Sequence, residues 1–157
     1  MTNEFNANDI FEMAVKIEQN GAIFYRDAAR QVEGENHKEF LLDLAKMEDE
    51  HETTFANMQK ELNLEEKSTT TFDPEDENVL YLKALADTRV FFAKEQPEKT
   101  LKSILGCALQ AEKDSIAFYL GMKELVPAKS GQSKIDKIIK EEMSHIRILA
   151  GKLTEYY

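Results

Sequence analysis

Two short sequences of the form Glu-x-x-His carry the strongest chemical signal in this chain. Glu48 with His51 forms one pair, and Glu142 with His145 forms the other. Side chains three positions apart share a face of a helix, so the carboxylate and imidazole of each pair would converge on one point. Imidazole and carboxylate ligands suit iron, manganese and zinc. Each pair is therefore a candidate half of a metal site.

Both pairs belong to an internal repeat with an offset of 94 positions. The matching residues are Glu18 and Glu112, Tyr25 and Tyr119, Glu48 and Glu142, and His51 and His145. In each half a single glutamate precedes the Glu-x-x-His pair by thirty residues, with Gly34 or Pro127 near the midpoint. A turn at that midpoint would join two antiparallel helices. The glutamate and the pair would then face each other at one level of the fold.

The repeat predicts a six-residue ligand set. One glutamate from each of two helices and a Glu-x-x-His pair from each of the other two is the arrangement of di-iron and di-manganese carboxylate bundles. Four carboxylates would balance two divalent ions, and the absence of thiolate ligands disfavours a structural zinc site. The alternative without metal is a set of partly solvated glutamates or ion pairs. The predicted ligands are Glu18, Glu48, His51, Glu112, Glu142 and His145, with Glu48 and Glu142 bridging both metals.

Apolar residues at alternating steps of three and four predict the helices that position this set. The expected long helices span about 8–32, 36–62, 98–126, and from 130 or 133 almost to 157. The connection 63–97 begins as a loop and continues as a shorter helix over 79–92. Neither half could close a core alone. We therefore expect one domain over 1–157, an all-α four-helix bundle whose helix pairs, 8–62 and 98–155, are joined by a long crossover.

Composition limits the kinds of binding partner and the cellular compartment that we expect for this protein. The 157 residues carry a net charge of −10, which argues against nucleic acid or an anionic membrane surface as a partner. The single cysteine, Cys107, excludes an internal disulfide or a Cys-x-x-Cys site. The first residues have no basic and apolar signal pattern, and no apolar run reaches the length of a membrane span. We expect a cytoplasmic protein.

At these motifs the sequence resembles the rubrerythrin family, within the ferritin-like di-iron carboxylate superfamily. The resemblance covers about 8–62 and 98–155 and rests on I-E-Q-N-G-A-I-F-Y, M-E-D-E-H, A-E-K-D-S-I-A-F-Y and E-E-M-S-H. It implies a ferritin-like bundle with two iron ions, manganese or zinc being compatible with the same ligands. It also implies an oxidoreductase that reduces hydrogen peroxide or dioxygen in the response to oxidative stress. Together with the apolar segments V-L-Y-L-K-A-L and V-F-F, the resemblance favours a homodimer.

Two departures from the family pattern leave alternatives open. The rubredoxin-like module with two Cys-x-x-Cys pairs is absent from this sequence, so electrons would come from an external donor protein or a small reductant. Ser115 stands where such proteins usually carry an extra metal-facing glutamate. The remaining six-ligand set resembles that of bacterioferritin, so a ferroxidase or iron-storage protein is one alternative. Asp49 replaces the haem-ligating methionine of that group, which disfavours haem. A non-catalytic, metal-stabilised bundle or interaction module is the other alternative.

Two tyrosines and several acidic residues lie close to the predicted ligands in the sequence. Tyr25 and Tyr119 lie two turns beyond Glu18 and Glu112 on the same helix faces. They could donate hydrogen bonds that hold ligand carboxylates in position, or could be ordinary core aromatics. No other catalytic residue is predicted. The acidic neighbours of the ligands are expected to point into solvent, and they are Asp49, Glu50, Glu52 and Glu141.

Overall fold

Four long helices and one shorter helix account for most of the computed structural model, which describes residues 6–62, 75–87, 98–126 and 129–157. The long helices are α1 (Ala7–Gln31), α2 (Glu35–Glu61), α5 (Leu101–Leu125) and α6 (Lys129–Leu153). The shorter helix is α4 (Glu77–Asp87), and a single 3-10 turn, η1 (Thr154–Tyr156), follows α6. The described residues include no strand. The all-α prediction is confirmed.

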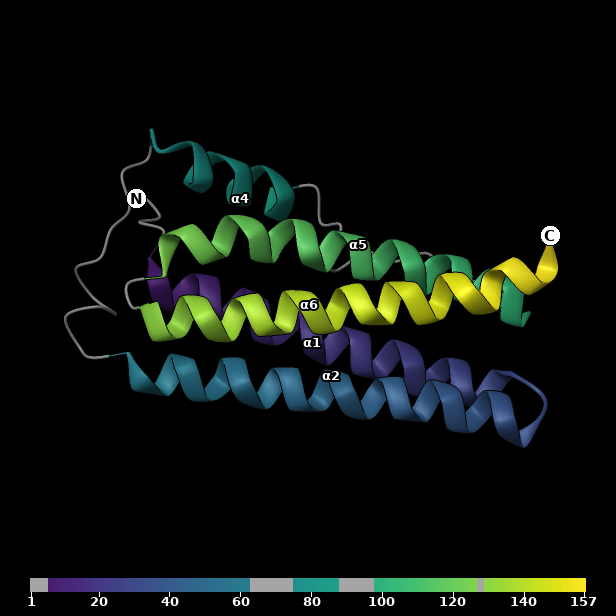
Figure 1. Cartoon of the computed structure of the whole chain (residues 1–157). Helices are drawn as coiled ribbons and strands as arrows, with labels where there is room; N and C mark the ends of the chain where they lie inside the picture. The colour runs from purple at the N-terminus through teal and green to yellow at the C-terminus, as the bar shows by residue number, and fades with distance from the viewer. Residues whose placement is uncertain (1–5, 63–74, 88–97, 127–128) are drawn as a thin grey trace.

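The long helices lie side by side as two antiparallel pairs, with α1 packed against α2 and α5 packed against α6 (Figure 1). α2 ends at the end of the bundle where α4 lies, whereas α5 begins near the opposite end (Figure 1). The chain between α2 and α5 therefore traverses the bundle lengthwise. This is the predicted four-helix bundle with a long crossover, and it places α2 and α5 parallel to each other.

Local sequence explains where the helices begin. Asn6 caps α1, because its side chain accepts a hydrogen bond from the Asp9 amide and the Asp9 carboxylate accepts one from the Asn6 amide, both at 3.0 Å. Thr100 caps α5 with a single bond, its hydroxyl oxygen accepting from the Ser103 amide. Gly34 precedes α2 with a φ of 94°, a conformation that favours glycine. The caps shift two predicted boundaries: α1 begins slightly earlier than position 8, and α5 begins later than position 98.

α4 packs on the outside of the bundle against α5 (Figure 1). Val79 and Leu82 are fully buried there, and the Tyr81 hydroxyl donates a hydrogen bond of 2.6 Å to the Ala117 carbonyl. Contact is close because Gly121 has no side chain: a Cβ at this position would lie 2.7 Å from the Tyr81 ring. The predicted helix over 79–92 is seen to Asp87, and the V-F-F segment lies outside the described residues.

The buried apolar residues form two clusters, separated by a polar layer. One cluster includes Phe11 and Phe55, and the other includes Leu41 and Leu149. Along α1 and α2, the first cluster lies on one side of Glu18 and Glu48 and the second lies on the other side. The predicted ligands therefore occupy the middle of the bundle, with apolar packing above and below them. Such packing fixes the helix positions and keeps bulk water away from the layer.

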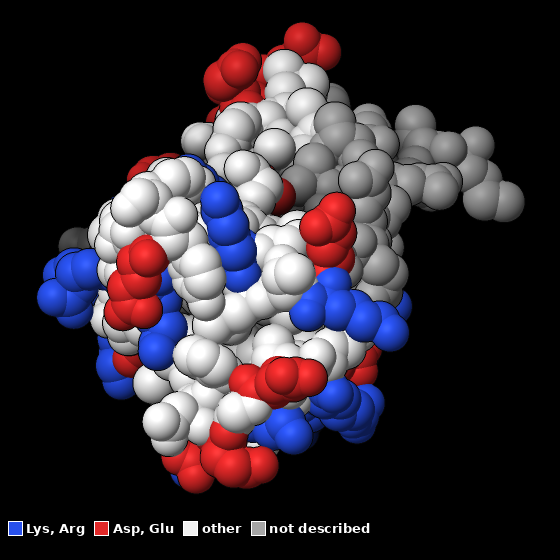
Figure 2. Space-filling view, turned by 90° about the vertical axis from the view of Figure 1, so that its right-hand side faces the viewer, with Lys and Arg blue, Asp and Glu red and all other residues white. Residues whose placement is uncertain are grey.

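The surface carries charges of both signs. At the end of the bundle where α1 joins α2, Lys and Arg side chains are interspersed with Asp and Glu, and neither sign forms a continuous patch (Figure 2). Among the described residues, no helix combines the length and the apolar character that crossing a membrane requires.

Candidate metal centre

The structure brings all six predicted residues together in the middle of the bundle. They form two overlapping groups of four, in which the candidate ligand atoms lie within 4.8 Å of one another. The first group is Glu18, Glu48, His51 and Glu142, and the second is Glu48, Glu112, Glu142 and His145. Glu48 and Glu142 belong to both groups. All six residues are buried, with at most 4% of their surface exposed.

Each histidine presents the same ring nitrogen to the carboxylates. His51 Nδ1 lies 2.7 Å from a Glu142 oxygen and 3.5 Å from a Glu18 oxygen. His145 Nδ1 lies 3.4 Å from a Glu48 oxygen and 3.5 Å from a Glu112 oxygen. The two imidazole rings are nearly parallel, with their centroids 5.7 Å apart. Both Nδ1 atoms therefore face the carboxylate cluster, while both Nε2 atoms face outward between α2 and α6.

Several polar atoms of this cluster are buried without a hydrogen bond. They are Glu18 Oε2, Glu48 Oε1, both Glu142 carboxylate oxygens, His51 Nδ1 and His145 Nδ1. Buried polar atoms are normally paired, and leaving one unpaired typically costs about 1–3 kcal/mol. A shared ligand would satisfy these atoms at once. Oxygen and imidazole nitrogen donors converging from four helices fit two divalent metal ions.

Electrostatics in the metal-free cluster reflects this crowding. Burial, reinforced by neighbouring carboxylates, raises the pKa of Glu48 well above its ordinary value. The pKa of Glu142 is raised for the same reasons. Burial also acts on Glu112, but the neighbouring Glu142 carboxyl, His145 and the Tyr25 hydroxyl outweigh it and lower the Glu112 pKa. Burial and mutual repulsion thus favour the protonated form of the two carboxylates that both groups share.

Tyr25 and Tyr119 tie the two helix pairs together at the cluster. Tyr25 of α1 donates a hydrogen bond of 2.6 Å to a Glu112 oxygen on α5. Tyr119 of α5 donates the equivalent bond to Glu18 on α1. Burial, together with the adjacent carboxylate, raises both tyrosine pKa values well above the ordinary value, so both hydroxyls keep their protons. Each tyrosine therefore helps to fix the orientation of one unshared glutamate.

The acidic neighbours do not all point into solvent as predicted. Asp49 is half-exposed and forms an ion pair with Arg26, and a Glu52 oxygen accepts a hydrogen bond from Gln19. The larger correction concerns Glu141, which is half-exposed but reaches His51, its Oε2 lying 2.7 Å from His51 Nε2. Helical periodicity places position 141 away from the inward face. Its long side chain nevertheless bridges the gap to α2.

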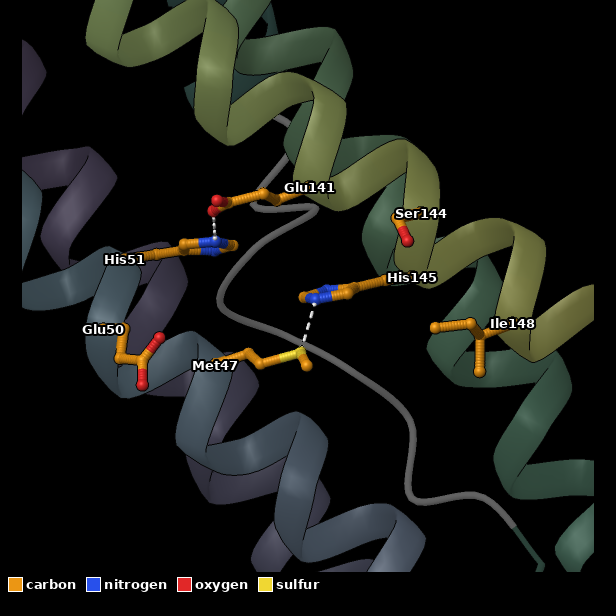
Figure 3. A pocket seen from close by; sticks show the side chains of 7 residues that line it. All are labelled: Met47, Glu50, His51, Glu141, Ser144, His145 and Ile148. Atoms are coloured by element: carbon orange, nitrogen blue, oxygen red, sulfur yellow. Dashed lines mark hydrogen bonds and ion pairs between the residues drawn. The ribbon is translucent and has the colours of Figure 1, made fainter.

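An open cavity of about 190 Å³ lies between α2 and α6, on the outer side of the two histidines (Figure 3). It is lined by Met47, Glu50, His51, Glu141, Ser144, His145 and Ile148. Its volume is several times that of one water molecule, which occupies about 30 Å³ in the liquid. A small polar solute could therefore reach the outer edges of both imidazoles.

A second space, of only about 10 Å³, lies between α1 and α5 beside Gly21 and Ser115. A Cβ at Gly21 would lie 3.2 Å from a Glu48 oxygen, so this glycine leaves room for the Glu48 carboxylate. The Ser115 hydroxyl donates to the Ala111 carbonyl at 3.0 Å and adds no carboxylate to the cluster.

The bundle topology, with its central layer of four carboxylates and two imidazoles, defines a ferritin-like protein of the di-iron carboxylate class. The chain belongs to the rubrerythrin family, whose model matches residues 9–153. It is also similar to a candidate ferritin-like diiron-carboxylate protein from Thermotoga maritima. That likeness has a TM-score of 0.72 and 26% sequence identity, and it covers 100% of each chain. A comparison with curated proteins returned no match.

Proposed function

We propose that this protein is an oxidoreductase that reduces hydrogen peroxide, or dioxygen, at a centre of two iron ions. The observation that carries the proposal is the pair of overlapping four-residue groups with two shared carboxylates. Because two carboxylates belong to both groups, the same set of side chains could hold two metal ions next to each other. Family membership supports iron as the metal, and the same donors would also accept manganese or zinc.

Each side chain has a distinct role in this proposal. Glu48 and Glu142 would each contribute to both metal positions, because each belongs to both groups. Glu18 and His51 complete one position, whereas Glu112 and His145 complete the other. The four carboxylates together carry a charge of −4 when ionised, which neutralises two divalent ions. These two shared carboxylates would have to be deprotonated to hold the metals.

When bound, two ferrous ions supply the two electrons that, with two protons, convert hydrogen peroxide to two waters. The chain orients the centre for this chemistry through Tyr25 and Tyr119, which hold Glu112 and Glu18. The cavity between α2 and α6 gives a small oxidant access to the histidine side of the centre. An external electron-donor protein would restore the ferrous state.

Peroxide titration of the iron-loaded protein tests this proposal. The chain is loaded with Fe(II) without oxygen, freed of excess metal and titrated with hydrogen peroxide. We expect one peroxide to be consumed per two Fe(II), with a rise in near-ultraviolet absorbance from a nearly colourless start. Glu48→Ala should lose this reaction, and Glu12→Ala, an exposed glutamate on α1, should retain it. Full iron loading without peroxide consumption would instead indicate a metal-stabilised bundle without redox activity.

A ferroxidase or iron-storage protein is the second candidate, favoured by one observation. Ser115 contributes no seventh ligand, and its hydroxyl is engaged with its own helix. Addition of many Fe(II) equivalents per chain in air separates the two functions. Storage would retain ferric iron far beyond two ions per chain. Peroxide or dioxygen reduction would leave two ions per chain and depend on a continuing supply of reductant.

A further inference from the structure

The repeat relates the two histidines of the centre, but their outer neighbours differ. The residue before each Glu-x-x-His pair is Met47 in one half and Glu141 in the other. Each of these side chains crosses the gap between α2 and α6 to the histidine of the opposite helix (Figure 3). Glu141 Oε2 lies 2.7 Å from His51 Nε2, and Met47 Sδ lies 3.1 Å from His145 Nε2. Equivalent positions thus supply chemically different partners.

The partner of His51 is a strong acceptor. An ionised carboxylate can only accept a hydrogen bond, so the proton of the neutral imidazole resides on Nε2 and the Nδ1 lone pair faces the cluster. His51 Nδ1 is the atom that lies 2.7 Å from Glu142. A carboxylate behind a metal-binding histidine fixes the ring and raises the basicity of the ligand nitrogen. Glu141 therefore strengthens the metal position that His51 serves.

The partner of His145 is much weaker. Its ring has the same orientation, with Nδ1 turned toward Glu48 and Glu112. The Met47 thioether is uncharged and is only a weak acceptor. It can help to hold the ring by contact, but it adds little to the basicity of His145. The metal position served by His145 lacks the electrostatic support that Glu141 gives to the other.

We propose that the two metal positions are inequivalent, and that Glu141 and Met47 set the difference. The position at Glu18 and His51 binds a divalent metal more tightly, and the position at Glu112 and His145 loses or exchanges its metal first. This inference rests on the proposed di-metal function. Both Glu141 and Met47 are partly exposed at the edge of the cavity, so substituting them leaves the apolar core intact.

Calorimetric titration of the metal-free protein with Co²⁺ tests the inference. We expect two binding events in the wild type, with clearly separated dissociation constants. Glu141→Gln should weaken the tighter event by about 10–100-fold, the range measured for such supporting partners, and leave the weaker event nearly unchanged. Met47→Glu, which copies the His51 arrangement, should tighten the weaker event. His51→Ala should remove the tighter event, and His145→Ala should remove the weaker one.

Glu50→Gln is the matched control for Glu141→Gln. Glu50 lines the same cavity and loses the same charge in the substitution, and no dashed line joins it to either histidine (Figure 3). Both constants should therefore stay at their wild-type values. Two equal constants in the wild type, or equal effects of Glu141→Gln and Glu50→Gln, would overturn the inference while leaving the di-metal centre standing. A wild-type chain that binds no Co²⁺ would overturn the centre itself, and the inference with it.

Discussion

The glutamate pair shared by both halves of the centre explains why the core tolerates so many buried carboxylates. An isolated buried carboxylate is costly, and several together repel one another. Without bound metal, protonation of Glu48 and Glu142 would relieve this repulsion, and their raised pKa values reflect that tendency. Two divalent cations would relieve it more completely, because all four glutamates could then remain ionised.

These raised pKa values predict how the stability of the metal-free protein depends on pH. An unfolded glutamate titrates near pH 4.3, so above that pH the folded state binds more protons at Glu48 and Glu142 than the unfolded state does. Their contribution to stability is complete below that pH and is lost as the pH rises through the folded pKa. The melting temperature with chelator present should fall between pH 5 and pH 8. The same fall in Glu48→Gln/Glu142→Gln would show that other groups cause it.

Tyr119→Phe should weaken metal binding without unfolding the bundle. The substitution removes the hydroxyl that holds Glu18, while the ring keeps its packing against Phe55, with the centroids 5.0 Å apart. We expect an affinity loss of about 10–100-fold at the position that includes Glu18. Tyr81→Phe removes an exposed hydroxyl that is bonded to the Ala117 backbone carbonyl and to no residue of the cluster, and it serves as the control. Equal binding by both variants would contradict the orienting role of Tyr119.

At the residue scale, the sequence revealed the six clustered residues because their types recur at a fixed offset. Two features of the site could not be predicted from the sequence. The hydrogen bond that His51 donates to Glu141 depends on the separation of α2 and α6, which no spacing within one helix contains. The hydrogen bonds that Tyr25 donates to Glu112 and that Tyr119 donates to Glu18 depend on how the two helix pairs dock.

At the scale of the helices, the inward stripes of apolar residues predicted the helix centres well. The ends were less certain, because Asn6, Asn8 and Asp9 can all cap a helix, and only the hydrogen bonds select Asn6. The docking of α4 on α5 could not be predicted either. It depends on Gly121 meeting Tyr81, two residues with no sequence relation.

Gly121→Ala tests how α4 is held. The added methyl would lie 2.7 Å from the Tyr81 ring and 3.0 Å from Leu82, so α4 must shift. Overpacking typically costs about 1–3 kcal/mol, and the helix preference for alanine over glycine returns about 1 kcal/mol. We expect a net loss of about 1 kcal/mol in the free energy of unfolding, measured with urea.

Gly106→Ala is the control on the same helix. A Cβ at Gly106 meets no atom within 4 Å, so this variant should gain up to about 1 kcal/mol from helix preference alone. If Gly121→Ala gained as much as Gly106→Ala, the close packing between α4 and α5 would contribute nothing to stability.

At the scale of the whole molecule, large apolar side chains that stay partly exposed on α4 are the reason to expect self-association. Leu80 and Tyr81 remain 44% and 37% exposed on this helix, although Val79 and Leu82 beside them are buried. We expect a homodimer, and light scattering after gel filtration should give about twice the 18.0 kDa mass of the chain. A stable monomer at micromolar concentration would contradict this expectation. A large shell would instead favour the iron-storage candidate.

The central claim is that the six clustered residues jointly hold two metal ions. The most direct test is elemental analysis of the wild type and Glu48→Ala, each loaded with Fe(II) without oxygen and freed of unbound metal. We expect close to two iron ions per wild-type chain and none retained by Glu48→Ala, because this carboxylate belongs to both groups. We also expect chelation to lower the wild-type melting temperature, since binding stabilises the folded state by mass action. Fewer than two ions in the wild type, or unchanged retention in the variant, would contradict the claim.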